Sequence, residues 1–211
     1  MRRLLLLAFA AAWFAATAEA RDSPADFAGA HVGLVTGYGF GASGDWCFCS
    51  FLPSAADAVE GEGGIVVGGE AGYGWRLGAL VIEAAARAQH ADIKFSDTCG
   101  AVPCSGETGW MLEAQLSAGI VLFDDILIAG TAGLAAADTY AQIGTADASS
   151  ALHDGTVLAA RIEQGMSDNW RMGLEYRHYD MHGTNDTPAG EADIDWTTQT
   201  IALVVNYELG E

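Results

Sequence analysis

Apolar and polar side chains alternate along most of the chain in stretches of about ten residues, each followed by a polar turn or loop. Successive side chains of a β-strand point to opposite faces, so an alternation with period two indicates strands rather than helices. The stretch at 126–137 is apolar throughout, and its two faces cannot be assigned from the pattern. Eight strands are predicted, at 30–40, 65–75, 80–90, 110–122, 126–137, 156–165, 171–179 and 196–209.

The charged residues within these stretches share a face with the glycines, while the opposite face is apolar. Apolar residues outside and polar residues inside are typical of a membrane-spanning β-barrel, whose lumen is hydrated. A soluble lipocalin-like barrel or a β-sandwich would reverse this pattern, and that alternative predicts apolar residues inside. The predicted lumen charges are Glu70, Glu83, Arg87, Glu113, Arg161, Glu163, Glu175 and Arg177.

The connections between the predicted strands alternate in length. Tight turns are predicted at 76–78, 124–125 and 167–169, and the other connections are long polar loops rich in Gly, Ser, Asp and Thr. Short turns at one end and long loops at the other are typical of an up-and-down barrel, and an even strand number puts both termini on the periplasmic side. The predicted fold is therefore all-β, an eight-stranded antiparallel up-and-down transmembrane β-barrel.

The first twenty residues have the pattern of a secretory signal peptide. Arg2 and Arg3 precede an uninterrupted apolar run at 4–16, and small residues flank Glu19 at the expected cleavage site after Ala20. The predicted organisation is a signal peptide at 1–20 and one outer-membrane β-barrel domain at 21–211.

Composition supports a membrane environment and argues against nucleic acid as a partner. The chain of 211 residues has 28 acidic and 9 basic residues and a mean hydropathy of +0.20. An acidic surface does not bind phosphate backbones. The longest apolar stretch of the mature part, 126–137, is shorter than the ~20 residues that a spanning helix needs. An apolar chain without such helices can live in lipid only as a closed barrel, in which all backbone groups pair between strands.

Several segments are similar to a known family. LEYRHYD (174–180) after a DNW turn, GGEAGYGW (68–75), GLVTGYG (33–39), TAGLA (131–135) and LVVNYEL (203–209) resemble strands of the small OmpA-like, porin-family outer-membrane barrels. The resemblance implies an outer-membrane location, outer-membrane lipid and the barrel-assembly machinery as partners, and a monomer. Members of that family usually end on an aromatic residue that the assembly machinery reads. Here Leu209 takes that place, followed by Gly210 and Glu211, so we expect less efficient assembly.

The predicted lumen charges admit two functions. An eight-stranded barrel is just wide enough to be filled by its own side chains, and isolated buried charges are costly, so five Glu and three Arg should pair and close the lumen. This predicts a structural protein that displays external loops. The alternative is a narrow channel for small solutes, in which two excess carboxylates favour cations. A secreted lipocalin-like ligand-binding barrel is the third hypothesis. No nucleophile or substrate cleft accompanies the carboxylates, so neither an enzyme nor a cofactor is expected.

Cysteines and aromatic residues complete the candidate features. Disulfides are expected for Cys47, Cys49, Cys99 and Cys104 in an oxidising compartment. Three pairings are possible, and a cross-loop pairing is favoured because a Cys47–Cys49 ring would be strained. A metal site at these cysteines is the alternative, although CxC and CxxxxC are not a strong zinc spacing. His178, Asp180 and His182 are interpreted as polar residues at a loop edge rather than as metal ligands. Interface aromatics are predicted at Tyr73, Trp75, Tyr176 and Tyr207, with Trp110 and Trp196 near other strand ends.

Overall fold

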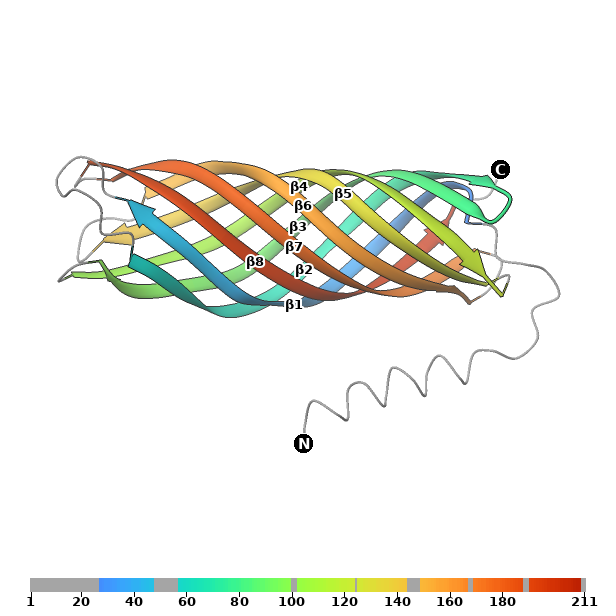
Figure 1. The fold of residues 1–211 in the computed structure, drawn as a ribbon, viewed down its shortest axis with the longest axis horizontal. Helices are drawn as coiled ribbons and strands as arrows, with labels where there is room; N and C mark the ends of the chain where they lie inside the picture. The colour runs from blue at the N-terminus through green and yellow to red at the C-terminus, as the bar shows by residue number, and fades with distance from the viewer. Residues whose placement is uncertain are drawn as a thin grey trace, which may run out of the picture.

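The computed structural model describes residues 27–47, 57–99, 102–123, 125–143, 149–166, 169–187 and 190–209. They form a closed antiparallel barrel in which each strand pairs with its neighbours in sequence and the first pairs with the last (Figure 1). The strands are β1 (Gly29–Cys47), β2 (Asp57–Leu77), β3 (Leu80–Cys99), β4 (Val102–Leu122), β5 (Ile126–Ile143), β6 (Ser149–Gly165), β7 (Trp170–Thr187) and β8 (Gly190–Glu208). The predicted fold class is confirmed. None of the described residues forms a helix long and apolar enough to cross a membrane.

Closure between β1 and β8 removes the two sheet edges that an open sheet would expose. Their register runs from His31 opposite Glu208 to Cys47 opposite Asp193, with one irregularity between Phe40 and Ser43, so the seam extends along nearly all of β1. In lipid, an unpaired backbone group costs several kcal/mol, which is why a sheet can span a bilayer only as a closed barrel. The tight connections, the beginning of β1 and the end of β8 lie together at one end of the barrel, which is called here the inner end. The other end is called the outer end.

The strands are longer than the sequence predicts. They contain 17 to 21 residues rather than about ten, and the additional residues lie almost wholly at the opposite, outer end. Much of what was predicted as long polar loop is therefore strand. For example, 91–99 continues β3, and 180–187 continues β7. These polar segments were interpreted as loops. Their composition instead reflects a change in the surroundings of the strands, whose outward side chains are polar at the outer end.

On the part of the barrel nearer the inner end, the outward side chains form an apolar belt. Leu34, Leu116 and Ile201 point outward and are more than half exposed. Two groups of aromatic side chains border the belt, as in membrane barrels. Near the inner end they are Tyr73, Trp75, Trp170 and Tyr207, and toward the outer end Tyr38, Phe40, Trp110 and Tyr176.

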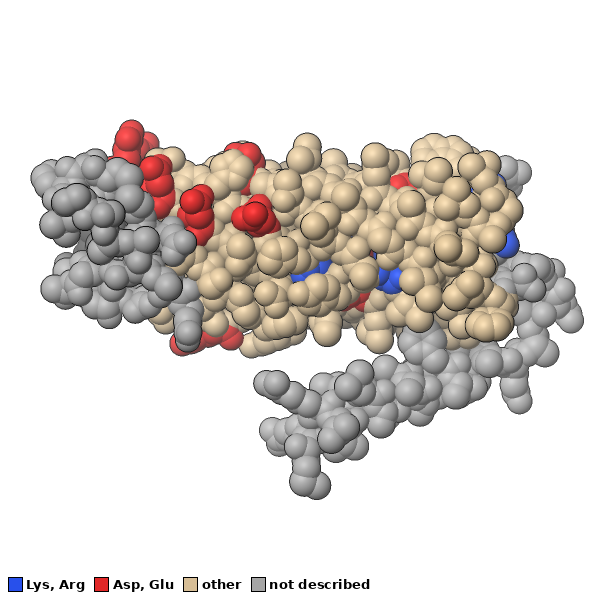
Figure 2. All heavy atoms as spheres, in the orientation of Figure 1, with Lys and Arg blue, Asp and Glu red and all other residues tan. Residues whose placement is uncertain are grey.

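Beyond the belt, the pattern of polar and apolar faces is inverted. On β8, Asp193 and Asp195 are exposed while Ile194 and Trp196 between them are buried. The prediction that apolar residues point outward thus holds for the belt. The outer end, which was predicted as loops, is instead built like a soluble barrel, with apolar residues inside. For the same reason Trp196 lies inside the barrel and not at a membrane interface. Figure 2 shows acidic side chains gathered at this end. The acidic residues of this outer wall are Glu62, Asp92, Glu107, Asp138, Asp154, Asp180, Asp186, Glu191, Asp193 and Asp195.

The structure also assigns the faces of β5, which the sequence left open. Leu127 and Ala129 are buried inside the barrel, whereas Ile128 and Leu134 face outward. Both faces of this strand are apolar because its inner half contributes to an apolar layer that closes the inner end of the lumen.

Because the surroundings of the outward face change along each strand, the cost of placing a charge on that face should depend on its position along the barrel. Leu116→Arg places a cation in the middle of the belt and should destabilise the barrel by about 2–4 kcal/mol, whereas the same change beyond the belt should cost roughly 0–1 kcal/mol. The matched variant is Ser105→Arg, on the outward face of the same strand. Urea unfolding in phospholipid vesicles measures both, and equal costs would contradict the proposed position of the belt.

Candidate functional site

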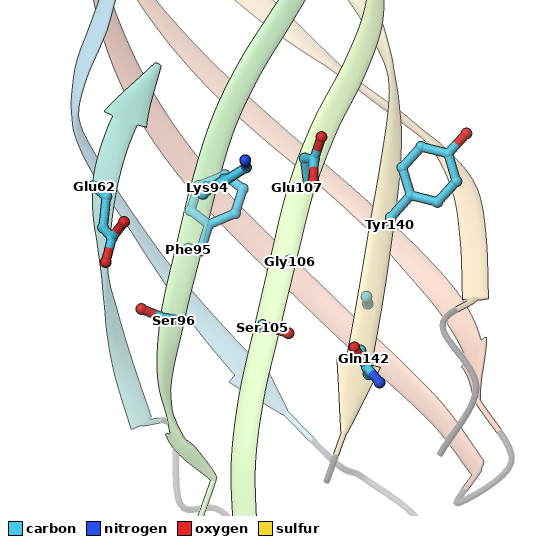
Figure 3. Close-up of a pocket in the computed structure, with 10 residues that line it drawn as sticks. Glu62, Lys94, Phe95, Ser96, Ser105, Gly106, Glu107, Tyr140 and Gln142 are labelled. Carbon is cyan, nitrogen blue, oxygen red and sulfur yellow. The ribbon is translucent and has the colours of Figure 1, made fainter. Parts of the chain in front are cut away.

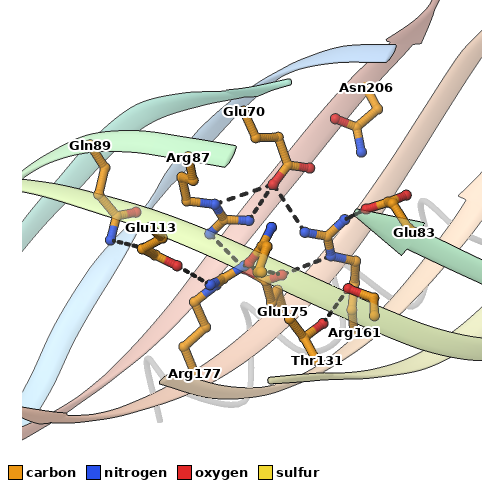
Figure 4. A network of polar contacts seen from close by, with 12 residues as sticks. Glu70, Glu83, Arg87, Gln89, Glu113, Thr131, Arg161, Glu175, Arg177 and Asn206 are labelled. Atoms are coloured by element: carbon orange, nitrogen blue, oxygen red, sulfur yellow. Dashed lines mark hydrogen bonds and ion pairs between the residues drawn. The ribbon is translucent and has the colours of Figure 1, made fainter. Parts of the chain in front are cut away.

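The interior of the barrel holds a cluster of ionisable side chains that are almost fully buried (Figure 4). Among the described residues, six glutamates and four arginines lie inside, and each is at most 8% exposed. If all of them are ionised, the cluster has a net charge of −2. They are Glu70, Glu83, Glu113, Glu163, Glu175 and Glu208, with Arg87, Arg161, Arg171 and Arg177.

Glu175 on β7 is the centre of this network, because it accepts hydrogen bonds from three arginines. Arg87 Nη1 donates to Oε1 at 2.8 Å, and Arg161 Nε donates to Oε2 at 2.7 Å. The third donor, Arg177, uses both Nε and Nη2. Hydrogen bonds between ionised groups are the strong ones, and one carboxylate offers enough lone pairs for all these contacts.

Glu70 joins two of the same arginines from the other side of the lumen. Its Oε2 accepts from Arg87 Nη2 at 2.6 Å and from Arg161 Nη2 at 3.0 Å. Glu70 and Arg87 are also direct cross-strand partners on β2 and β3, so the strand register brings them together. The network thus ties β2 and β3 to β6 and β7 across the barrel.

Toward the outer end, the network ends in uncharged partners. Arg177 donates to Glu113 and, at 2.7 Å, to Gln115 Oε1. The other carboxylate oxygen of Glu113 accepts from the Tyr179 hydroxyl at 2.9 Å and from Gln89 at 3.0 Å. These residues form the boundary between the charged layer and the apolar outer core.

Toward the inner end, the charges are less tightly paired. Arg171 lies 3.2 Å from Glu163, 3.6 Å from Glu83 and 3.3 Å from Glu208. His31 Nε2 lies 3.7 Å from Glu83. The guanidinium of Arg171 also stacks over the Phe27 ring at 5.6 Å from its centroid.

Apolar layers lie on both sides of the charges. At the inner end the layer consists of Phe27, Val81, Val121, Leu127 and Ala129. At the outer end a larger core surrounds Phe95, Met111, Tyr179, Met181 and Trp196. The interior of the described barrel is therefore layered, with apolar side chains above and below the charges.

The structure brings all eight predicted lumen charges together in this one network. Sequence reasoning missed Arg171, Glu208 and His31, which are also buried inside. The alternation in the sequence already pointed to them, because each of the three lies an even number of positions from inward-facing residues of its own strand. Arg171 and Glu208 lie near the ends of the predicted strands 171–179 and 196–209.

The predicted interface aromatics all lie on the outward face. Tyr73, Trp75, Tyr176 and Tyr207 are 38–48% exposed, and the rings of Tyr73 and Trp75 are 5.0 Å apart. The predicted disulfides lie outside what the structure describes. Cys49 is not among the described residues, and only the backbone is described for Cys47, Cys99 and Cys104. Cys47, Cys99 and Cys104 were predicted to lie in loops, and this was wrong, because they belong to β1, β3 and β4.

The outer wall has a shallow hollow of about 340 Å³ across β2 to β5, which includes Glu62, Lys94, Glu107 and Tyr140 (Figure 3). Lys94 Nζ lies 3.2 Å from Asp92 Oδ1, and this hydrogen bond raises the pKa of Lys94. The described residues contain no group of three or more His, Cys, Asp or Glu side chains placed to hold a metal ion. His178 and His182 lie on the outward face of β7, where His182 Nε2 is 3.3 Å from Asp154.

A closed eight-stranded barrel with an apolar outer belt and a charged interior is the architecture of a bacterial outer-membrane β-barrel. The family model described as outer membrane protein beta-barrel domain matches residues 4–208, and the chain belongs to this family. The chain is 27% identical to the 31 kDa outer-membrane immunogenic protein of Brucella melitensis, over 97% of this chain and 98% of that protein.

Solved structures support the same fold. OprG from Pseudomonas aeruginosa matches with a TM-score of 0.54 at 9% identity, over 89% of this chain and 100% of the other. Neisserial surface protein A matches with a TM-score of 0.51 at 11% identity, over 85% and 97%. These two structures support the fold, and the family match shows that the protein is located in the outer membrane.

Neutralising the central carboxylate should be far more costly than neutralising an exposed one. Glu175→Gln leaves three buried guanidinium groups short of a charge partner, and breaking a buried ion pair in this way costs about 3–5 kcal/mol. Asp180→Asn, on the outward face of the same strand, should cost under about 0.5 kcal/mol. Urea unfolding in vesicles compares the two variants, and a cost below about 1 kcal/mol for Glu175→Gln would show that water already solvates the network.

Proposed function

We propose that the protein is a structural, non-enzymatic component of the outer membrane, whose lumen is closed by its own glutamate and arginine side chains and whose outer end is displayed to the medium. The observation that carries this proposal is the convergence of Arg87, Arg161 and Arg177 on Glu175. The three guanidinium groups donate hydrogen bonds to one carboxylate in the middle of the lumen, and this packing supports a lumen that is too narrow for a hydrated ion at that level.

The width of the barrel supports closure. Eight strands enclose a space that side chains just fill. Large side chains occupy it here at three levels, with Phe27 near the inner end, the charged residues in the middle and Trp196 toward the outer end, all of them at most 8% exposed.

A narrow cation channel is the second candidate, favoured by one observation. The six glutamates and four arginines leave two carboxylates in excess, so an open lumen would attract cations and repel anions. A rearrangement of Glu113 and Arg177 would be needed first, because this pair lies in the boundary layer between the charged layer and the outer core.

Planar bilayers separate the two candidates. The purified protein should give no reproducible current steps under conditions in which a porin in the same bilayer does. Single-channel steps with a preference for cations that are lost in Glu113→Gln would overturn the closed lumen and establish the channel.

Display of the outer end can be tested at the one lysine of the chain. Lys94 is on the outer wall, and its side chain is 52% exposed, so a membrane-impermeant amine reagent should label it on intact cells. Peptide mass mapping locates the label, and Lys94→Arg is the control that should lose it. Labelling of Lys94 only after the cells are broken would show that this end faces the periplasm.

A further inference from the structure

One buried polar cluster lies within the apolar outer core, away from the charged network. His153 on β6, Asn185 on β7 and Trp196 on β8 are at most 2% exposed and are linked by hydrogen bonds. The His153 ring lies 2.7 Å from Asn185 Oδ1 through Nε2, and 3.1 Å from Trp196 Nε1 through Nδ1. Asn185 Nδ2 contacts the backbone carbonyls of Thr139 and Ser149, both at 3.3 Å.

These contacts fix both the tautomer and the charge of His153. An indole N–H only donates, so Nδ1 of His153 must accept the bond from Trp196 and cannot carry a proton. Asn185 uses its Nδ2 group on the two carbonyls, which leaves Oδ1 to accept from the Nε2–H of His153. The imidazole is therefore neutral whenever the cluster is intact.

We infer that the cluster of His153, Asn185 and Trp196 is a proton-sensitive latch that holds the outer ends of β5 to β8 together and releases them when the medium becomes acidic. A proton on Nδ1 would point the ring N–H at the indole N–H, which breaks the bond to Trp196 and places a charge in an apolar core. The closed latch and the protonated imidazole exclude each other.

The surroundings offer little to stabilise a charged ring. The nearby charged and titratable groups are Asp154, His182 and Asp195, on the outward faces of β6, β7 and β8. Burial is the main cause that lowers the pKa of His153, and it outweighs the attraction of the Asp154 and Asp195 carboxylates. The ring also packs closely against the backbone of Gly183, since a Cβ atom built on Gly183 would lie 2.4 Å from its Cδ2 atom.

Release of the latch would loosen the outer core rather than the whole barrel. Trp196 packs against Phe95 with ring centroids 5.5 Å apart, so losing its hydrogen bond weakens an aromatic contact between β3 and β8. The charged layer does not contain any residue of the latch. We expect the outer ends of the strands to open locally while the belt and the charged layer stay folded.

The size of the effect follows from proton linkage. An imidazole that is neutral in the closed state and has a pKa of about 6.5 in the open state makes closing about tenfold less favourable for each pH unit below 6.5. The sign is that stability falls as pH falls, because the open state binds the additional proton. Between pH 7.5 and 5.0 the protection of the outer amides should drop about 30-fold.

Hydrogen–deuterium exchange of the full-length protein in phospholipid nanodiscs tests the inference. After correction for the intrinsic pH dependence of exchange, wild-type amides at 179–186 and 193–197 should lose protection about 30-fold at pH 5.0, and those at 171–176 should not. His153→Gln keeps a donor and an acceptor but cannot be protonated, so its outer amides should be insensitive to pH. Heat-modifiable gel migration at pH 7.5 checks that the variant is folded.

Other histidines provide the controls. His182→Gln, on the exposed face next to the latch, should behave as wild type, and so should His31→Gln at the inner end of the lumen. Trp196→Phe removes the indole donor and should lower protection already at pH 7.5, with a smaller further change at pH 5.0. Equal pH sensitivity in wild type and His153→Gln, or an equal loss of protection along all of β7, would overturn the latch.

Discussion

Charges enclosed at membrane depth have few partners other than one another, and this constraint organises the barrel. Glu175 shows it most clearly, since it accepts hydrogen bonds from arginines on β3, β6 and β7. Each of these arginines also reaches a second carboxylate, Glu70 or Glu113, so the pairing extends around the lumen. Because most of these partners come from different strands, the network selects one register for the strands that carry it. A slip by one residue would turn these charges toward lipid.

The second organising feature is the inversion of the two faces beyond the outer aromatic residues. Within the belt the outer face is apolar and the lumen charged, whereas on β8 beyond it Asp195 faces out and Trp196 faces in. The same strands thus pass through two surroundings. In the belt they turn apolar side chains outward and bury charged ones, and beyond the belt they turn polar side chains outward and bury apolar ones. The outer end gains an apolar core of its own, in which the few polar groups, such as those of His153 and Asn185, need specific partners.

The sequence predicted the architecture well, because period-two alternation determines which face of a strand is buried. It identified strand number, antiparallel topology and the inward side of Glu70, Arg87, Glu113 and Glu175. It failed at the outer ends, where alternation continues with opposite sense: the polar residues at 180–187 have the composition of a loop, and only their pairing with β8 reveals a strand. It also could not place the contact between Glu175 and Arg87, because these two residues meet across the lumen and do not lie on neighbouring strands. Nothing local in the sequence encodes such a contact.

The family match and the fold show an outer-membrane barrel, and we propose that paired charges fill its lumen and keep it dry. The alternative, a hydrated lumen, differs in one thermodynamic property, which is the coupling between neighbouring charges. A double-mutant cycle with Glu70→Gln and Arg87→Met measures it directly, by urea unfolding of the four proteins in vesicles. Our account predicts a coupling of about 1.5–3 kcal/mol, so that the double variant is more stable than the sum of the single changes implies. Additivity within about 0.5 kcal/mol would show that water solvates both side chains, and would contradict the closed lumen.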